Sequence, residues 1–266
     1  MRTKPSRRFS EMPSPSSFQG KLKAIIEDYE KKRIRWYRLL GADCPLTGHR
    51  NRSLQGILAE VVKQGWDYYP TETDCLCDFK EAATVFERRS HNVDYSPEDI
   101  VAVSGVASAW QLLHNVILES GDEIVVIEPA HYLTGPVLSA RYSGANVIQV
   151  PMVEEEQWTL DPDVLRTAVN DKTKAIVIDH PNNPTGHIYS EKERKALVDI
   201  AGEYDIPIIS DELYCEITYD HNMAPSMAAV GGDVPVVVLT SLSKLFMVPG
   251  WRIGYVAFHD PRGRIM

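Results

Sequence analysis

From about residue 100, short apolar runs alternate with longer segments of helical periodicity. The apolar runs are rich in valine and isoleucine, as in parallel strands that are buried on both faces. This alternation predicts an α/β fold, a three-layer sandwich with a mostly parallel sheet. The expected strands are 100–103, 123–127, 146–150, 174–179, 206–209, 235–239 and 253–258. The expected helices between them are 107–118, 132–142, 162–169 and 190–204.

Two of the expected helices carry clear start signals. Asp161 precedes Pro162, which places a capping carboxylate before a proline in the first turn. Ser190 is followed three residues later by Glu193, the spacing of a capping box. These signals support the helix assignments at 162–169 and 190–204.

The chain before residue 67 has a different character. Residues 1–18 are rich in proline, serine and arginine, which predicts a disordered arm; a transit peptide has a similar basic composition. Apolar residues at helical spacing predict an amphipathic helix over 19–39 and a helical run near 54–64. We therefore divide the chain into a disordered arm (1–18), an N-terminal helical segment (19–66) and one large domain (67–266).

Composition excludes several classes of protein. The 266 residues are 44% hydrophobic and 24% charged, which is typical of a globular domain. The net charge of −9 argues against general nucleic-acid binding. No apolar run is long enough to span a bilayer, so no membrane partner is expected.

The cysteines predict neither a disulfide framework nor a metal site. The chain has only four, Cys44, Cys75, Cys77 and Cys215, in 266 residues. Cys75 and Cys77 are separated by one residue rather than two, and no second cysteine or histidine cluster follows them. We expect all four to be reduced, in a cytoplasmic protein.

A lysine follows the apolar run 235–239 after a few polar residues. The stretch 240–255 reads TSLSKLFMVPGWRIGY and places Lys244 near the end of the expected strand. Desolvating an ammonium is costly, so a lysine there is a candidate for amine chemistry such as a Schiff base. The alternative is a lysine that extends to solvent from an ordinary turn. Ser241 and Arg252 favour amine chemistry, because a hydroxyl and a planar guanidinium suit a phosphate dianion.

Three other motifs follow expected strands, where open α/β sheets bind their ligands. Residues 104–108 (SGVAS) offer a glycine and free helix N–H groups to an anion, although a plain capped turn would look similar. Residues 180–186 (HPNNPTG) form a rigid turn that presents an amide. Asp211 ends an apolar run; it suits a protonated ring nitrogen, or it caps a helix.

In their order along the chain, these motifs resemble those of the fold-type-I pyridoxal-phosphate enzymes, in the class I/II aminotransferase family. The match is strong over residues 100–258, and 180–186 agrees with the family signature at every position. The resemblance implies the large-domain fold of the pyridoxal-phosphate-dependent transferases, aminotransferase type I, over 67–266. It also implies pyridoxal 5'-phosphate as the cofactor.

The resemblance assigns a role to each matching residue. Lys244 forms the internal aldimine and later acts as the general base, while Asp211 holds the ring nitrogen; these two are the expected catalytic residues. Asn183 and Tyr214 contact the phenolic oxygen of the cofactor. The phosphate is held by Gly105, Val106, Ala107, Ser241 and Arg252.

Two aromatic assignments also follow from the resemblance. The ring that stacks on the cofactor is His131 by strict spacing from Pro129, or Tyr132 by size. Tyr68, in a Tyr-x-Pro segment, reaches the phosphate of a neighbouring subunit, which implies a homodimer. The glycine that usually follows this proline in the family is absent here.

The implied function is transfer of an amino group between an amino acid and a 2-oxo acid, within amino-acid metabolism and biosynthesis. A β-lyase, a cyclopropane-forming synthase or an amino-acid oxidase would keep the same cofactor residues. The sequence ends soon after Arg252, and nothing matches the family's C-terminal small domain with its carboxylate-binding arginine. We therefore expect a truncated large domain, and a non-catalytic cofactor-binding protein is a further alternative. A regulator is disfavoured because no helix-turn-helix pattern is present.

Overall fold

The computed structural model describes residues 16–35, 52–65, 76–130, 135–219 and 222–265. Contacts divide the chain into two compact units, residues 1–44 and 45–266. The described part of the first unit is helix α2 (Ser16–Lys31) followed by a turn. This helix begins inside the predicted disordered arm and ends well before residue 39. Residues 1–15 of the predicted arm lie outside the described residues.

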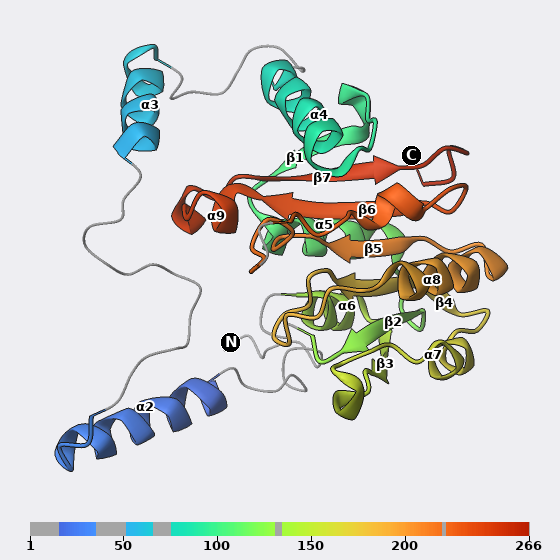
Figure 1. The fold of residues 1–266 in the computed structure, drawn as a ribbon, viewed down its shortest axis with the longest axis horizontal. Helices are drawn as coiled ribbons and strands as arrows, with labels where there is room; N and C mark the ends of the chain where they lie inside the picture. The colour runs from blue at the N-terminus through green and yellow to red at the C-terminus, as the bar shows by residue number, and fades with distance from the viewer. Residues whose placement is uncertain (1–15, 36–51, 66–75, 131–134, 220–221, 266) are drawn as a thin grey trace, which may run out of the picture. The chain divides into compact units, whose positions relative to one another are not determined.

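The second unit is built on one sheet of seven strands (Figure 1). Their order is β1-β7-β6-β5-β4-β2-β3; β7 runs antiparallel to both of its neighbours, β1 and β6, and the other neighbouring pairs are parallel. The mostly parallel sheet predicted from the sequence is confirmed. The strands are β1 (Ile100–Val103), β2 (Glu123–Glu128), β3 (Asn146–Pro151), β4 (Thr173–Asp179), β5 (Ile208–Asp211), β6 (Val236–Ser241) and β7 (Gly254–His259).

Helices cover both faces of this sheet and enclose two apolar cores. One core lies under α5 (Val106–Ile117) and α6 (Pro136–Ser143). The other lies under α4 (Cys77–His91), α7 (Pro162–Ala168) and α8 (Glu191–Glu203). The result is the three-layer sandwich that the alternating pattern predicts. Helix α3 (Arg52–Lys63) forms in the region where a helical run was expected near 54–64.

The predicted helix starts have the expected geometry. Asp161 accepts a hydrogen bond from the backbone N–H of Asp163 at the start of α7. Ser190 and Glu193 form the reciprocal capping box of α8, and Glu193 also accepts from the N–H of Leu160. Both caps satisfy backbone donors that the first helical turn leaves free.

The structure corrects three local predictions. Helix α4 was not predicted; its buried face is narrow, and it carries many charged residues. Strand β5 begins and ends two residues later than expected, so that Asp211 is its last residue. Lys244 does not lie at the end of a strand: β6 ends at Ser241, and the lysine belongs to the short helix α9 (Leu242–Leu245).

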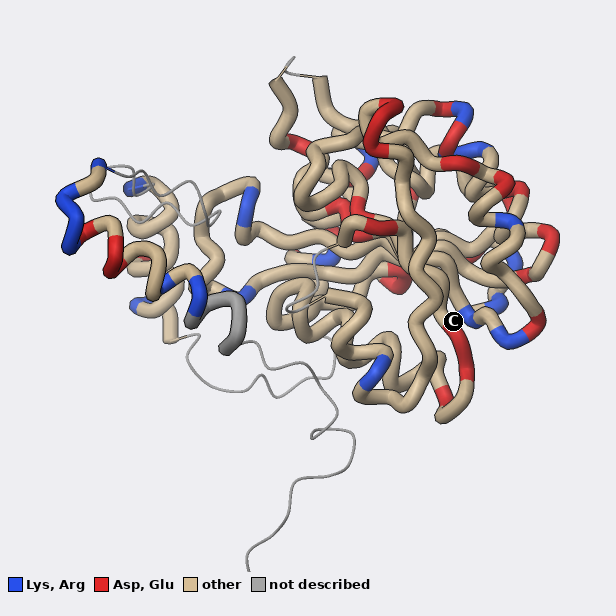
Figure 2. Tube along the Cα trace, turned by 90° about the horizontal axis from the view of Figure 1, so that it is seen from below, with Lys and Arg blue, Asp and Glu red and all other residues tan. Residues whose placement is uncertain are grey.

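Charges are mixed along the described chain. Acidic and basic residues alternate over short distances, in α2 as well as around the sheet (Figure 2). None of the described helices combines the length and the apolar composition that crossing a bilayer requires.

A buried histidine links α5 to α6 and makes stability depend on pH. His114 is fully buried, and its Nδ1 lies 2.7 Å from the Ser139 hydroxyl. Burial lowers the pKa of His114 from 6.5 to about 4. The unfolded chain therefore binds a proton that the folded chain rejects over this range. The stability that the folded chain has with a neutral His114 is fully present above pH 6.5, and it is lost as the pH falls towards 4.

We expect the variant His114→Gln to flatten the pH dependence of unfolding between pH 6.5 and 4, by up to about 3 kcal/mol. Glutamine keeps a hydrogen-bonding group near Ser139 but does not titrate. Urea unfolding at a series of pH values measures the slope. The surface variant His259→Gln is the control and should keep the wild-type slope. Equal slopes for wild type and His114→Gln would contradict the assignment.

Candidate active site

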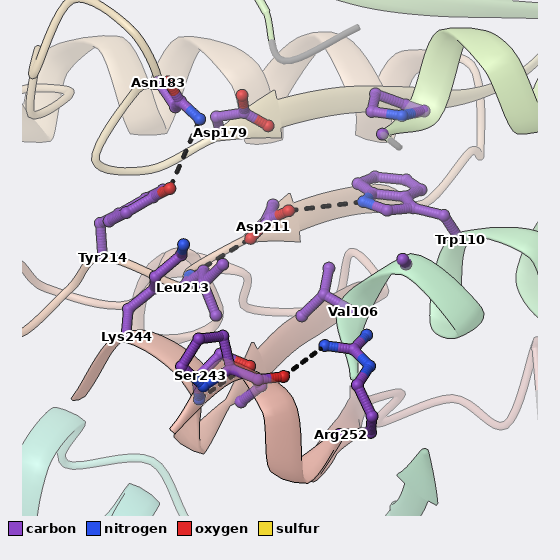
Figure 3. Close-up of a pocket in the computed structure, with 15 residues that line it drawn as sticks. Val106, Trp110, Asp179, Asn183, Asp211, Leu213, Tyr214, Ser243, Lys244 and Arg252 are labelled. Carbon is purple, nitrogen blue, oxygen red and sulfur yellow. Dashed lines mark hydrogen bonds between the residues drawn. The ribbon is translucent and has the colours of Figure 1, made fainter. Parts of the chain in front are cut away.

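A cavity of about 180 Å³ lies beyond the carboxyl ends of the central strands. Its walls come from the four sequence motifs and from the start of α6 (Figure 3). Parallel strands end at the same edge of a sheet, so residues far apart in sequence meet there. The lining residues from the predicted site are Val106, Ala107, Asn183, Asp211, Tyr214, Ser241, Lys244 and Arg252.

Lys244 reaches this cavity from α9. Ser241, the last residue of β6, caps the helix by accepting a hydrogen bond from the Ser243 N–H at 3.1 Å. This cap turns the chain so that Lys244 extends toward the part of the cavity where Asp211 and Tyr214 lie (Figure 3). The lysine is only partly buried. Its amine is therefore available to a ligand in the cavity.

Asp211 holds a carboxylate at the bottom of the cavity. Its two oxygens accept hydrogen bonds from the Leu213 N–H at 3.2 Å and from the Trp110 indole at 3.4 Å (Figure 3). Burial raises the pKa of Asp211 from 3.8 to about 6, and these two donors oppose the increase. A cation beside this carboxylate would be stabilised strongly, because little water screens the pair.

The turn 180–186 brings an amide to the cavity. Asn182 is buried and fixes the turn, since its amide donates to the Pro129 carbonyl and its oxygen accepts from Thr185. Asn183 is left facing the cavity, with its amide 3.5 Å from the Tyr214 hydroxyl (Figure 3). The two polar groups can donate to one shared acceptor between them.

A cationic corner forms where α5 begins. The Arg252 guanidinium donates to the Ser104 carbonyl at 3.1 Å and to the Pro249 carbonyl at 2.9 Å. Gly105 precedes α5 with φ of 79°, and no side chain caps the helix. The first N–H groups of α5, Arg252 and the Ser241 hydroxyl together suit an anion with several oxygens.

We expect Gly105→Ala to weaken cofactor binding by at least about tenfold, because a β-carbon at Gly105 would lie 2.9 Å from the Arg252 guanidinium carbon. The positive φ adds a strain of about 1 kcal/mol to any alanine there. Gly121→Ala is a matched control: its φ is 97°, and its β-carbon would meet nothing within 4 Å. Titration of each variant with pyridoxal phosphate separates the collision from the strain. Equal affinities in the two variants would contradict the predicted role of Gly105.

Some cavity residues were not found by sequence reasoning. Trp110 is 1% exposed and contacts Asp211 across 101 residues of sequence. Asp179 pairs with Asp211 in the register of β4 and β5, and it also lines the cavity. Both residues lie in segments whose sequence pattern is that of an ordinary apolar core. For Asp179, its position at the end of an expected strand is the one feature that could have indicated a role in the site. Tyr68, His131 and Tyr132 lie outside the described residues, so their roles stay predictions.

The fold and the cavity define a class of protein. A three-layer α/β sandwich with a lysine, an aspartate and an asparagine at or just after the ends of three neighbouring strands, beside an anion corner, is the arrangement of a fold-type-I pyridoxal-phosphate enzyme. The family description "Aminotransferase class I and II" matches residues 57–265. The chain belongs to this family, and pyridoxal phosphate is the family's cofactor, as the motifs predict.

Individual relatives agree with this assignment. The chain is 36% identical over 205 residues to a tyrosine aminotransferase of Dictyostelium discoideum, covering 77% of this chain and 48% of that protein. It is 34% identical over 189 residues to an aspartate aminotransferase of Bacillus subtilis, covering 70% and 48%. An alanine aminotransferase structure from Pyrococcus furiosus superposes with a TM-score of 0.88 at 33% identity, covering 98% of this chain and 65% of that one. The chain spans about half the length of the curated relatives it matches.

The residues present fit the cofactor. Its phosphate matches the corner formed by the N-terminus of α5, Ser241 and Arg252. Gly105 leaves the space that a β-carbon would take from the Arg252 side chain. The amine of Lys244 suits an aldehyde, and the buried carboxylate of Asp211 suits a ring cation. The anion corner, the space at Gly105, the amine and the buried carboxylate together indicate this cofactor more specifically than any one of them does alone.

Proposed function

We propose that this chain carries the cofactor site of a pyridoxal-phosphate-dependent aminotransferase, which transfers an amino group between an amino acid and a 2-oxo acid. One observation carries the proposal: Lys244, Asp211, Asn183 and Arg252 come from four separate segments and line one cavity. The relatives described above are all aminotransferases. This supports amino transfer over the lyase, synthase and oxidase alternatives.

When bound, pyridoxal phosphate supplies an electron sink for the carbon that bears the amino group. The protein's residues provide the rest. Lys244 supplies the amine that links the cofactor to the chain and then moves the proton of the substrate carbon. Asp211 keeps a ring cation charged through ion pairing at the bottom of the cavity. The Arg252 corner anchors the phosphate, which fixes the orientation of the ring.

The substrates that we propose are an α-amino acid and a 2-oxo acid. The names of the relatives include tyrosine, aspartate and alanine aminotransferases. These three amino acids differ in side-chain size and charge, so they make an informative first panel. The described cavity residues do not distinguish among them.

The test is a visible absorption spectrum of the purified chain with pyridoxal phosphate, before and after the three amino acids are added. A cofactor band that fades while a 2-oxo acid accumulates would support the proposal. A band that forms but does not respond to any amino acid would favour the non-catalytic cofactor-binding alternative. Absence of any protein-bound band would overturn both.

We also propose that the protein acts as a homodimer in the cytoplasm. The dimer is supported by the Tyr-x-Pro segment at Tyr68, and the compartment by the low number of cysteines, four in 266 residues. Mixing Lys244→Ala with Tyr68→Phe tests the dimer, because a mixed dimer has one site with both residues intact. Activity of the mixture above that of either variant alone would support it; a monomer in sedimentation would overturn it.

A further inference from the structure

A second cluster of polar side chains lies behind the cofactor site. His91 is the last residue of α4, while Glu212 and Cys215 follow β5. One nitrogen, one oxygen and one sulfur from these three residues all lie within 4.8 Å of one another. His91 is more than a hundred positions from the other two residues, which are three positions apart, so no spacing motif in the sequence indicates the cluster. Glu212 and Cys215 are buried, at 3% and 2% exposure.

The His91 ring is oriented as in a metal ligand. Its Nδ1 is buried and has no hydrogen-bond partner among the described residues. The backbone of Ala224 lies close enough to the ring to favour its protonated form, against the effect of burial on the His91 pKa. A backbone carbonyl that accepts from one nitrogen fixes the neutral tautomer and leaves a lone pair on the other. One nitrogen of the His91 ring lies within 4.8 Å of a Glu212 oxygen and of the Cys215 sulfur.

The Glu212 carboxyl group is held in the same way. Its Oε1 accepts from the Ser210 hydroxyl at 2.9 Å and from the Met227 N–H at 2.8 Å. The remaining oxygen, Oε2, lies 3.8 Å from the Cys215 sulfur. Hydrogen bonds of this kind orient carboxylate ligands around metals in proteins. A buried carboxyl oxygen, a thiol and an unpaired imidazole nitrogen therefore converge on one point.

We propose that His91, Glu212 and Cys215 bind a zinc ion. Imidazole, thiolate and carboxylate are all common zinc ligands, and one thiolate with one carboxylate neutralises a divalent cation. Tetrahedral zinc holds its ligand atoms roughly 3.3–3.6 Å apart, so the three side chains need to close by about 1 Å. On binding, the Cys215 thiol and any protonated Glu212 release their protons to solvent.

The fourth coordination position is open to a cavity. The three residues line a cavity of about 290 Å³, whose other walls are mostly apolar and include Phe79 and Phe86 of α4 and Leu242 and Leu245 of α9. A water molecule in this cavity completes a four-coordinate site without further protein ligands. Among the residues that the structure describes, Leu213 and Ser241 line both this cavity and the one that Lys244 lines, and the other lining residues differ.

The location gives the zinc ion a consequence. Glu212 directly follows Asp211, and Cys215 directly follows Tyr214, so the metal holds a segment that also lines the cofactor cavity, through Asp211, Leu213 and Tyr214. It also joins that segment to α4. Zinc at a hundred times its Kd should raise the midpoint of thermal unfolding by roughly 5–10 °C. The proposal is independent of the proposed enzyme function, because no residue assigned to the cofactor is a ligand.

Cobalt(II) and zinc titrations of the purified chain test the site. Cobalt should give a thiolate-to-metal charge-transfer band, which zinc then removes. His91→Gln and Cys215→Ser should lose this band and bind zinc at least about 100-fold more weakly. Cys77→Ser, which changes an exposed cysteine outside the cluster, should keep the cobalt band and the zinc affinity of the wild type. Retention of the full band in His91→Gln or Cys215→Ser would overturn the proposal.

A second measurement on the wild type guards against variants that do not fold. X-ray absorption of the zinc-loaded protein should show one sulfur and three nitrogen or oxygen neighbours. Two or more sulfurs would overturn the proposal, because they would assign the metal to other cysteines of the chain. No charge-transfer band in the wild type would overturn it equally.

Discussion

Replacing Lys244 with alanine should remove the lysine-dependent absorption band of the bound cofactor and lower the rate of amino transfer by at least about 10⁴-fold. The lysine is expected both to link the cofactor to the chain and to move the substrate proton. Its loss therefore removes two steps, and a general base alone accounts for about 10²–10⁴-fold. Absorption spectra and 2-oxo acid production measure the two effects separately.

The matched control for Lys244→Ala is Lys192→Ala, which removes an exposed lysine from α8. That variant should keep both the band and the activity of the wild type. Added methylamine provides a further check, because a free amine can replace the missing proton acceptor in part. An unchanged band in Lys244→Ala would show that another amine holds the cofactor, and would contradict the assignment.

The strand-end motifs were the predictable part of the site. Each one combines an apolar run with a residue that is costly to bury, so the local sequence alone marks a position of unusual chemistry. The parallel sheet then brings the motifs together, since parallel strands end at one edge. This is why the sequence alone predicts Asp211, Asn183 and Lys244 in one site, and all three line the same cavity.

Contacts between distant segments were the unpredictable part. In the sequence, Trp110 looks like any other core residue on the buried face of a helix. The fold is needed to show that its indole lies beside Asp211. Helix α4 was missed because its charged residues hide a buried face. The same helix brings His91 to Glu212, a meeting that no local pattern encodes. Sequence periodicity predicts elements, whereas pairings between elements depend on how their side chains pack.

Replacing Asp211 with asparagine should lower the rate of amino transfer by about 10²–10³-fold, the usual cost of losing one preorganised electrostatic group. Asparagine has the shape of aspartate and can keep its bonds to the Leu213 N–H and the Trp110 indole. It carries no charge, so it cannot hold a ring cation in the cavity. Steady-state kinetics with a saturating amino acid measures the loss.

The pH dependence of cofactor affinity distinguishes a charge effect from a packing effect. Burial raises the pKa of Asp211 to about 6, so in the wild type the carboxylate becomes protonated below that pH. Its attraction for a cation is present above pH 6 and is lost as the pH falls. The cofactor phosphate also titrates near pH 6, but equally in both proteins. The ratio of wild-type to Asp211→Asn affinity should therefore shrink about tenfold per pH unit below 6.

Trp110→Phe, which keeps the carboxylate, should retain the wild-type pH dependence with its midpoint moved upward, because the indole bond favours the charged form of Asp211. A ratio that does not change between pH 5 and 8 would mean that Asp211 acts through shape alone.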